Sequence, residues 1–316
     1  MTGQRDHGGG LDAAVARFGG DRADWIDLST GINPVPYPLG EIPAEAWTAL
    51  PDAAATERLI RAARAFWQVP EGAGIVPAPG ASALIARMPD LTGARRVAIP
   101  GPTYNEHAAA FRARGAKVIA GTDPGADLAV LVHPNNPDGR LWPAPDGPAV
   151  IDESFCDLCP ADSHVRLAAR PGVIVLKSFG KFWGLAGLRL GLAIGRPETL
   201  AALPDLLGPW PVSGPALAIG ARALEDTPWA ETTRDRLASD ARRLDALMTA
   251  AGARVAGGTT LFRLYEVADA EAAQTHLARH RIWSRIFPYS RTWLRLGLPA
   301  PDGWDRLEAA LSGLPG

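Results

Sequence analysis

Short runs of consecutive apolar residues alternate with amphipathic stretches through the middle of the chain. Each run is rich in β-branched residues and bounded by Gly or Pro, which is typical of strands. Because the apolar positions are continuous rather than alternating, we predict strands that are covered on both faces, as in a mostly parallel sheet. The runs occupy residues 75–79, 95–102, 116–121, 127–134, 148–154 and 173–179.

The apolar positions within 105–115 have helical spacing, and the pattern changes after residue 205. Thr227 and Pro228 provide an N-cap and a first-turn proline for a long helix that we expect to end near Gly252. Further strands and helices are then predicted in a smaller α+β unit. The strands cover 261–267, 282–287 and 293–298, and the helices cover 269–280 and about 303–312.

These patterns predict an α/β fold with three parts. The first 40 residues are rich in Gly and Pro, which favours an N-terminal arm (1–40). A large sheet domain (41–205) and a small C-terminal domain (206–316) follow. At 316 residues the chain is long enough for this division.

Composition narrows the class of protein without naming a function. Hydrophobic residues make up 47% and charged residues 21%, which is ordinary for a soluble globular protein. A formal net charge of −2 gives no reason to expect a nucleic acid or an anionic membrane as partner. No run of about 18 uncharged apolar residues occurs. The first 20 residues lack the apolar core of a secretory signal, so we predict a cytoplasmic protein.

The two cysteines, Cys156 and Cys159, form a single CxxC. A structural zinc site needs about four ligands, and no second Cys/His pair has suitable spacing, so no metal is predicted. A redox pair is the alternative to two small, partly buried side chains.

Four polar groups follow predicted strands, where open α/β sheets bind ligands. Gly80, Ala81 and Ser82 open a helix whose N-terminal N–H groups suit a phosphate, although Gly is common in such turns. Asn135 and Asn136 stand in a loop that a simple turn would also explain. The other two groups are Asp152 with Glu153, and the segment around Lys181.

Carboxylates at the end of a buried strand need a cationic or protonated partner, so Asp152 indicates either a structural ion pair or a functional site. The chain has only three lysines, and two of them, Lys177 and Lys181, lie in one Gly-rich segment. Lysine can lose its proton and act as a nucleophile, which arginine cannot. Ser178 and Arg189 in the same segment could hold a phosphate.

The order of these motifs resembles that of the fold-type-I pyridoxal-phosphate enzymes of the aspartate aminotransferase superfamily. HPNNPDGR, VIDESF and KSFGKFWGLAGLRLG are similar to its segments NPNNPTG, DE-[AS]-[YF] and SFSK-x-x-GLAGLR-x-G. The resemblance spans roughly residues 24–300. It implies pyridoxal 5′-phosphate as cofactor, a seven-stranded sheet flanked by helices, and a homodimer.

The resemblance also implies a role for individual residues. Lys181 would be the lysine that bonds to the cofactor, and Asp152 would face the pyridine nitrogen. Asn136 would contact the phenolic oxygen, and Tyr104 would stack on the ring. Lys177, whose spacing does not match, is interpreted as an incidental strand-end charge. The phosphate would be held by Gly80, Ala81, Ser82, Ser178 and Arg189.

Two positions depart from the family pattern. Phe155 stands where many relatives have Tyr, which removes one hydrogen bond to the cofactor. Leu50 replaces the Tyr of a Tyr-Pro-Asp motif that reaches the partner subunit's phosphate, so that contact is in doubt.

Within the superfamily, HGGG near the N-terminus, DLSTGINPVPYP, DESF and WLRLGLP are most similar to the threonine-phosphate decarboxylases of cobalamin biosynthesis. The predicted substrate is therefore a phosphorylated amino acid. Arg285 would meet its phosphate and Arg295 its carboxylate. His7, Gly8 and Gly9 would close over the phosphate, and Asn33 would orient the substrate. The alternatives are an aminotransferase on a substrate such as histidinol phosphate, or a non-catalytic binding module.

Overall fold

A computed structural model describes residues 7–314 of the chain. It divides into two compact units. One, the sheet unit, consists of Pro36–Asn136 and Arg140–Glu231. The other, the small unit, consists of the chain up to Val35, Pro137–Gly139, and the chain from Thr232 onward.

The sheet unit is built on one seven-stranded sheet in the order β2-β8-β7-β6-β5-β3-β4. All pairings are parallel except those of β8, which runs antiparallel to both of its neighbours. This confirms the predicted α/β fold with a mostly parallel sheet. The strands are β2 (Gly74–Ala78), β3 (Arg96–Ile99), β4 (Lys117–Ala120), β5 (Leu128–Val132), β6 (Ala149–Asp152), β7 (Val173–Ser178) and β8 (Gly191–Gly195).

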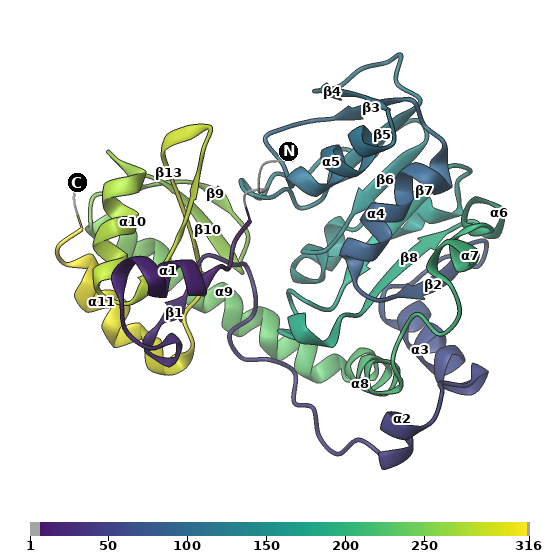
Figure 1. Cartoon of the computed structure of the whole chain (residues 1–316), viewed down its shortest axis with the longest axis horizontal. Coiled ribbons are helices and arrows are strands. Elements are labelled where there is room, and N and C mark those ends of the chain that lie inside the picture. Colours follow the sequence, from purple (N-terminus) through teal and green to yellow (C-terminus); the bar gives the residue numbers. More distant parts are fainter. Residues whose placement is uncertain (1–6, 315–316) are drawn as a thin grey trace. The chain divides into compact units, whose positions relative to one another are not determined.

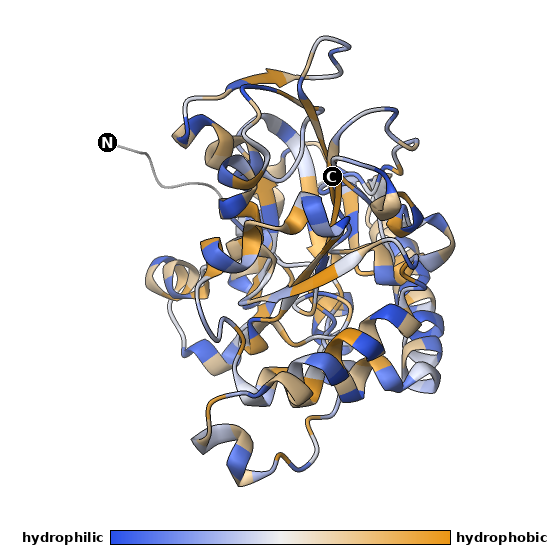
Figure 2. Cartoon of the chain, turned by 90° about the vertical axis from the view of Figure 1, so that its right-hand side faces the viewer, coloured by the Kyte–Doolittle hydropathy of each residue, from blue (hydrophilic) through white to orange (hydrophobic). Residues whose placement is uncertain are grey.

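Helices flank this sheet (Figure 1). Leu84 and Met88 from α4 and Phe111 from α5 pack against strand residues such as Val130 and Ile174, and all five side chains are buried. Figure 2 shows blue and orange bands alternating along the helices, as expected when one face meets a core. The helices are α2 (Ala44–Thr48), α3 (Ala53–Phe66), α4 (Ala81–Thr92), α5 (Asn105–Ala113), α6 (Pro197–Leu200), α7 (Leu203–Leu207) and α8 (Gly214–Glu225).

The predicted domain boundary at residue 205 differs from the division into units. Helix α8 packs against α3 and therefore belongs to the sheet unit. The long helix α9 (Thr227–Ala250) begins in the sheet unit and continues in the small unit. Periodicity along the chain does not reveal which core a helix joins.

The small unit contains an antiparallel four-stranded sheet in the order β12-β13-β10-β9. Its strands are β9 (Arg254–Gly258), β10 (Phe262–Glu266), β12 (Arg285–Phe287) and β13 (Ser290–Gly297). A separate parallel pair joins β1 (Ile26–Asp27) to β11 (Ile282–Trp283). The helices of this unit are α1 (Leu11–Phe18), α10 (Ala270–Arg279) and α11 (Trp304–Leu311).

The N-terminal segment differs from the predicted arm, of which residues 1–6 lie outside the described residues. Leu11 and Ala14 of α1 are buried in a cluster with Trp25 and Ala278. The Gly-rich composition of the segment did not indicate the short apolar face of α1. This face becomes part of a core once β1 pairs with β11. In the part of the chain that the structure describes, no helix is long and apolar enough to cross a membrane.

Candidate active site

One cavity in the sheet unit collects nearly all the residues predicted to bind a cofactor. It lies where β5, β6 and β7 end and α4 begins, the edge at which α/β sheets bind ligands. Of the predicted set only Gly80 is not part of the wall, and it directly precedes Ala81. The predicted residues in the wall are Ala81, Ser82, Tyr104, Asn136, Asp152, Ser178, Lys181 and Arg189.

At one end of this pocket the chain forms a cradle of backbone and cationic groups. Gly80 has a φ of 90° and precedes the first turn of α4. A Cβ atom added to Gly80 would lie 2.4 Å from Arg189 Nη2, and one added to Gly191 would lie 2.5 Å from the Ala81 nitrogen. Only glycine fits at both positions. A helix N-terminus, an arginine and the Ser82 hydroxyl together suit a phosphate group.

The carboxylate of Asp152, which also lines this pocket, accepts hydrogen bonds from three donors. His107 Nε2 lies 2.9 Å from Asp152 Oδ2, and the Ser154 nitrogen and hydroxyl donate to Oδ1 at 3.0 and 2.5 Å. Burial of Asp152 opposes ionisation, but these partners outweigh it and hold the pKa of the carboxyl below its usual value. The group is therefore a buried carboxylate that can face a cation.

Sequence reasoning did not identify His107. Its side chain is completely buried on α5, one helical turn after Tyr104, and the two rings pack edge to face with their centroids 6.2 Å apart. The spacing of three residues was the available signal, because residues i and i+3 share a helix face. Nothing in the sequence placed that face against Asp152.

The two neighbouring lysines have different environments. Lys181 lines the pocket and lies 5.6 Å from the centre of the Phe155 ring. Lys177 is almost fully buried and its Nζ lies 2.6 Å from Glu153 Oε2. The interpretation of Lys177 as an incidental strand-end charge is therefore wrong, since its side chain is inside the sheet unit.

Electrostatics distinguishes the lysines as well. Burial alone would lower the pKa of Lys177, but the nearby Glu153 and Asp157 carboxylates raise it above its usual value. A permanently charged ammonium cannot attack a carbonyl carbon. Of the two lysines in this segment, only Lys181 lies in the pocket with Asp152 and Asn136.

Cys156 and Cys159 of the CxxC are free thiols, the first buried and the second partly exposed. No group of three or more His, Cys, Asp or Glu that could hold a metal occurs among the described residues. Contact with Cys159, burial and the Glu153 charge raise the pKa of the Cys156 thiol well above its usual value. Because the thiolate is the reactive form, this environment favours the structural interpretation of the pair.

The residues predicted to bind substrate all belong to the small unit. A cavity there is lined by His7, Gly8, Gly9 and Arg285, and Arg285 Nη1 donates to the His7 carbonyl. Arg295 is 5% exposed and its Nη2 donates to the Ser29 carbonyl at 2.7 Å. Ser29, which Arg295 contacts, lines the same cavity as His7, Gly8, Gly9 and Arg285, and the substrate-binding roles of the two arginines stay predictions.

Asn33 has a partner that the sequence did not reveal. Its Oδ1 accepts a hydrogen bond from Arg236 Nη2 at 2.6 Å and another from the Val35 nitrogen at 3.0 Å. Arg236 also donates to Asp240, four residues later on α9, at 3.1 Å. This fixes the orientation of the Asn33 amide within the small unit.

The cradle at Gly80 yields a first testable expectation. Replacing Gly80 with alanine forces Arg189 to move and places a side chain at a positive φ, which L-residues rarely adopt. We expect pyridoxal phosphate to bind on the order of tenfold more weakly to the apoprotein, by fluorescence titration. Gly93→Ala is the control, because Gly93 also has a positive φ but its Cβ would meet nothing within 4 Å. Equal weakening in both variants would contradict the cradle.

Comparison with known proteins identifies the family of the chain. The family model "Aminotransferase class I and II" matches residues 24–310. Threonine-phosphate decarboxylase of a Sinorhizobium species is 43% identical, with 97% of each chain covered. The enzyme of the same name from Pseudomonas aeruginosa is 39% identical over 98% of this chain and 97% of its own.

Among solved structures, the histidinol-phosphate aminotransferase of Sinorhizobium meliloti in complex with pyridoxal 5′-phosphate has a similar fold. Its TM-score is 0.79 at 20% identity, with 98% of this chain and 96% of that chain covered. The phosphate cradle, buried carboxylate and pocket lysine fit this cofactor. The chain therefore belongs to the aminotransferase class I and II family and uses pyridoxal 5′-phosphate as its cofactor.

Proposed function

We propose that the protein is a threonine-phosphate decarboxylase, which converts L-threonine O-3-phosphate to (R)-1-amino-2-propanol phosphate and CO2. The observation that carries this proposal is the 43% identity over 97% of the chain to a relative of that name. The pocket supports it, because Lys181, Asp152 and the phosphate cradle lie together. The reaction would then belong to cobalamin biosynthesis, and the protein would act in the cytoplasm.

Residues that line the pocket would anchor the cofactor. The N-terminus of α4, Ser82, Ser178 and Arg189 would hold the phosphate, and the Asp152 carboxylate would keep the pyridine nitrogen protonated. Asn136 would donate to the phenolic oxygen, and Tyr104 would cover the ring. When bound, the cofactor supplies an electron sink for the bond that breaks at Cα. Phe155 leaves the pocket without the phenolic hydroxyl that a tyrosine would provide.

In this scheme Lys181 supplies the proton that Cα needs after CO2 has left. The Cα–carboxylate bond of the substrate breaks, CO2 leaves, and one proton must be added to Cα to give the product. The Lys181 ammonium delivers that proton, because its side chain lines the pocket that contains Asp152. Lys177 cannot replace it, because its ammonium is bound to Glu153.

Substrate recognition falls to the small unit in this proposal. Arg285, with His7, Gly8 and Gly9, binds the substrate phosphate, and Arg295 binds the carboxylate. The amide of Asn33, oriented by Arg236, positions the amino acid backbone. Two arginines match a substrate with two anionic groups.

The alternative is an aminotransferase, which breaks the Cα–H bond instead and needs a keto acid to complete its cycle. Purified holoenzyme is incubated with L-threonine O-3-phosphate and no keto acid, and CO2 is measured. Release of one CO2 per amine product is expected. Product formation only when 2-oxoglutarate is added would show an aminotransferase, and a complete lack of turnover of phosphorylated substrates would favour a binding module.

We further propose a homodimer formed through the sheet unit. Leu39, Trp47 and Leu50 are 50–67% exposed, and Trp210, 58% exposed, lines a groove with Pro51. Apolar side chains concentrated in this way indicate a surface that another protein covers. Asp52, next to them, caps α3 and accepts from the Ala55 nitrogen.

Size-exclusion chromatography with light scattering tests the dimer. We expect the native protein to elute as a dimer and Trp210→Glu to elute mainly as a monomer, because a buried interface charge is costly. Tyr289→Glu is the control, since Tyr289 is also 54% exposed but belongs to the small unit. A monomeric native protein, or dissociation by both variants, would disagree with the assigned surface.

A further inference from the structure

The ends of β6 and β7 carry two residues of the pocket, each next to a residue that faces away from it. Asp152 and Ser178 line the pocket, whereas Lys177 lines a different cavity. Successive side chains along a strand point to opposite faces of the sheet, so Lys177 and Glu153 lie away from the pocket. The strands are parallel neighbours, and the Glu153 nitrogen extends their ladder by donating to the Leu176 carbonyl at 2.9 Å.

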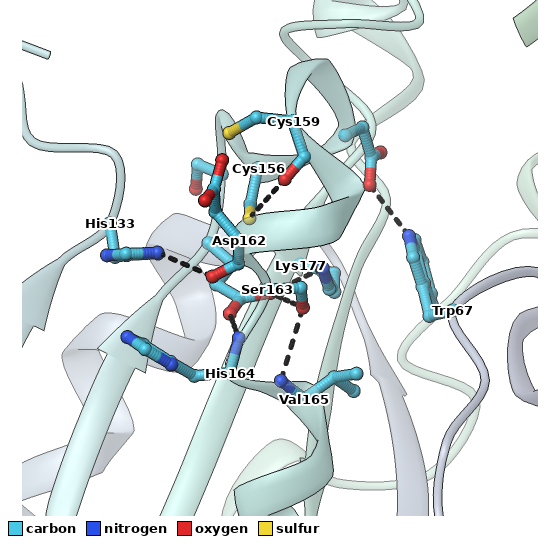
Figure 3. A network of polar contacts seen from close by, with 12 residues as sticks. Trp67, His133, Cys156, Cys159, Asp162, Ser163, His164, Val165 and Lys177 are labelled. Atoms are coloured by element: carbon cyan, nitrogen blue, oxygen red, sulfur yellow. Dashed lines mark hydrogen bonds and ion pairs between the residues drawn. The ribbon is translucent and has the colours of Figure 1, made fainter. Parts of the chain in front are cut away.

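Glu153 and Lys177 form an ion pair in this interior. The side chain of Lys177 is 2% exposed and that of Glu153 is completely buried. Besides Lys177 at 2.6 Å, the carboxylate accepts from the Ser163 hydroxyl at 2.7 Å and from the His164 nitrogen at 2.5 Å. Figure 3 shows Ser163, His164 and Lys177 converging on one point. Three donors thus fix the position of one carboxylate.

The pair stays charged in spite of its burial. Desolvation opposes the charge on Glu153, but Lys177 and the two other donors hold its pKa below the usual value. Buried ion pairs are seldom the most stable choice, because an apolar pair of similar volume often packs equally well. What an apolar pair lacks is direction, since dispersion contacts do not fix one geometry as hydrogen bonds do.

The geometry fixed by this pair is transmitted to the pocket through very short stretches of backbone. Asp152 and Ser154 flank Glu153 in a tight turn, in which the Ser154 nitrogen and hydroxyl donate to Asp152 Oδ1. Holding the Glu153 side chain therefore holds the backbone from which the Asp152 carboxylate projects. On β7, Lys177 directly precedes Ser178.

We propose that the Glu153–Lys177 ion pair is a positioning element of the cofactor site, which holds Asp152 and Ser178 at the separation that pyridoxal phosphate requires. It acts through these two residues and does not touch the cofactor. The inference rests on the roles proposed for Asp152 and Ser178, but it does not depend on which substrate the enzyme converts.

The experiment separates positioning from stability. Apoprotein of the native chain, Lys177→Met, Glu153→Gln and the double variant Glu153→Met/Lys177→Met is titrated with pyridoxal phosphate, and Tm is measured on the same samples. The single variants should have a lower Tm than the native protein, because each leaves an uncompensated buried group. The double variant should recover most of that Tm. Its cofactor affinity should nevertheless stay lower than native by on the order of tenfold.

Val175→Ala is the matched control. Val175 lies on β7, two residues before Lys177, and is completely buried, so its truncation loosens the same strand without touching the ion pair. It should lower Tm and leave cofactor affinity within about twofold of native. That change is small compared with the tenfold loss expected when a residue that supports a ligand-binding group is removed. If Lys177→Met does not fold, Glu153→Gln carries the test, because Gln keeps the volume and one oxygen acceptor but not the charge.

Two results would overturn the proposal. One is native affinity in the double variant or in Glu153→Gln, and the other is an equal loss of affinity in Val175→Ala. The readout is cofactor binding rather than turnover. A native enzyme that binds pyridoxal phosphate but releases no CO2 would therefore count against the decarboxylase assignment and leave this proposal standing.

Discussion

Replacement of Lys181 with alanine is expected to lower CO2 release from L-threonine O-3-phosphate by about 10⁴-fold, the upper range for losing a group that transfers a proton. The variant should fold normally, because Lys181 lies at the pocket wall rather than in the core. It should also lose the covalent retention of cofactor that sodium borohydride produces in the native enzyme. Single-turnover CO2 release and mass spectrometry of the reduced protein measure the two effects.

The other lysines supply the contrast for Lys181. Lys117 is exposed on β4, and Lys117→Ala should change neither turnover nor cofactor retention. Retention of the cofactor on Lys181→Ala after reduction would mean that another amine carries it, and the assignment of Lys181 would then fail.

Asp152→Asn is expected to lower kcat by about 10³-fold, comparable to the loss of one preorganised electrostatic group. Asparagine retains the size, its Oδ1 can still accept from Ser154, and its amide nitrogen can donate to His107 Nε2, so the fold should survive. What it lacks is the negative charge that keeps the pyridine nitrogen protonated. The absorbance of the bound cofactor should become sensitive to pH in the variant, and steady-state kinetics with spectral titration measures both changes.

The pH range of this test follows from the direction of the pKa shift. Because the folded-state pKa of Asp152 lies below its usual value, the carboxylate stays charged above about pH 5. The stability that its charge contributes is present above the unfolded pKa and is lost as the pH falls through the folded pKa. Native activity between about pH 5 and 8 should therefore show no titration of Asp152.

Asp245→Asn is the control for Asp152. Asp245 accepts from Arg263 at 2.8 Å and from the Tyr265 hydroxyl at 2.8 Å in the small unit, so its loss should lower Tm but not kcat. A similar fall in kcat for both variants would indicate general destabilisation. Full activity of Asp152→Asn would remove Asp152 from the proposed mechanism.

The sequence by itself was sufficient for features that depend on neighbours along the chain. Continuous apolar runs predicted the strands of the parallel sheet, because burial on both faces leaves no polar positions. The segment around Lys181 predicted a lysine near a phosphate site. These signals are local, with all their residues within about one strand and one turn.

Only the tertiary structure decided which distant residues meet. His107 and Asp152 are 45 residues apart, Glu153 and Lys177 are 24 apart, and Asn33 and Arg236 are 203 apart. Strand order brings β6 between β5 and β7, and no periodicity in the sequence encodes that order. The same limit explains the N-terminal segment, whose Leu11 and Trp25 become core residues only when they pack with Ala278. For Lys177, burial beside Glu153 converted an apparently incidental charge into part of the interior, because a charge is stable there only with a partner that the fold supplies.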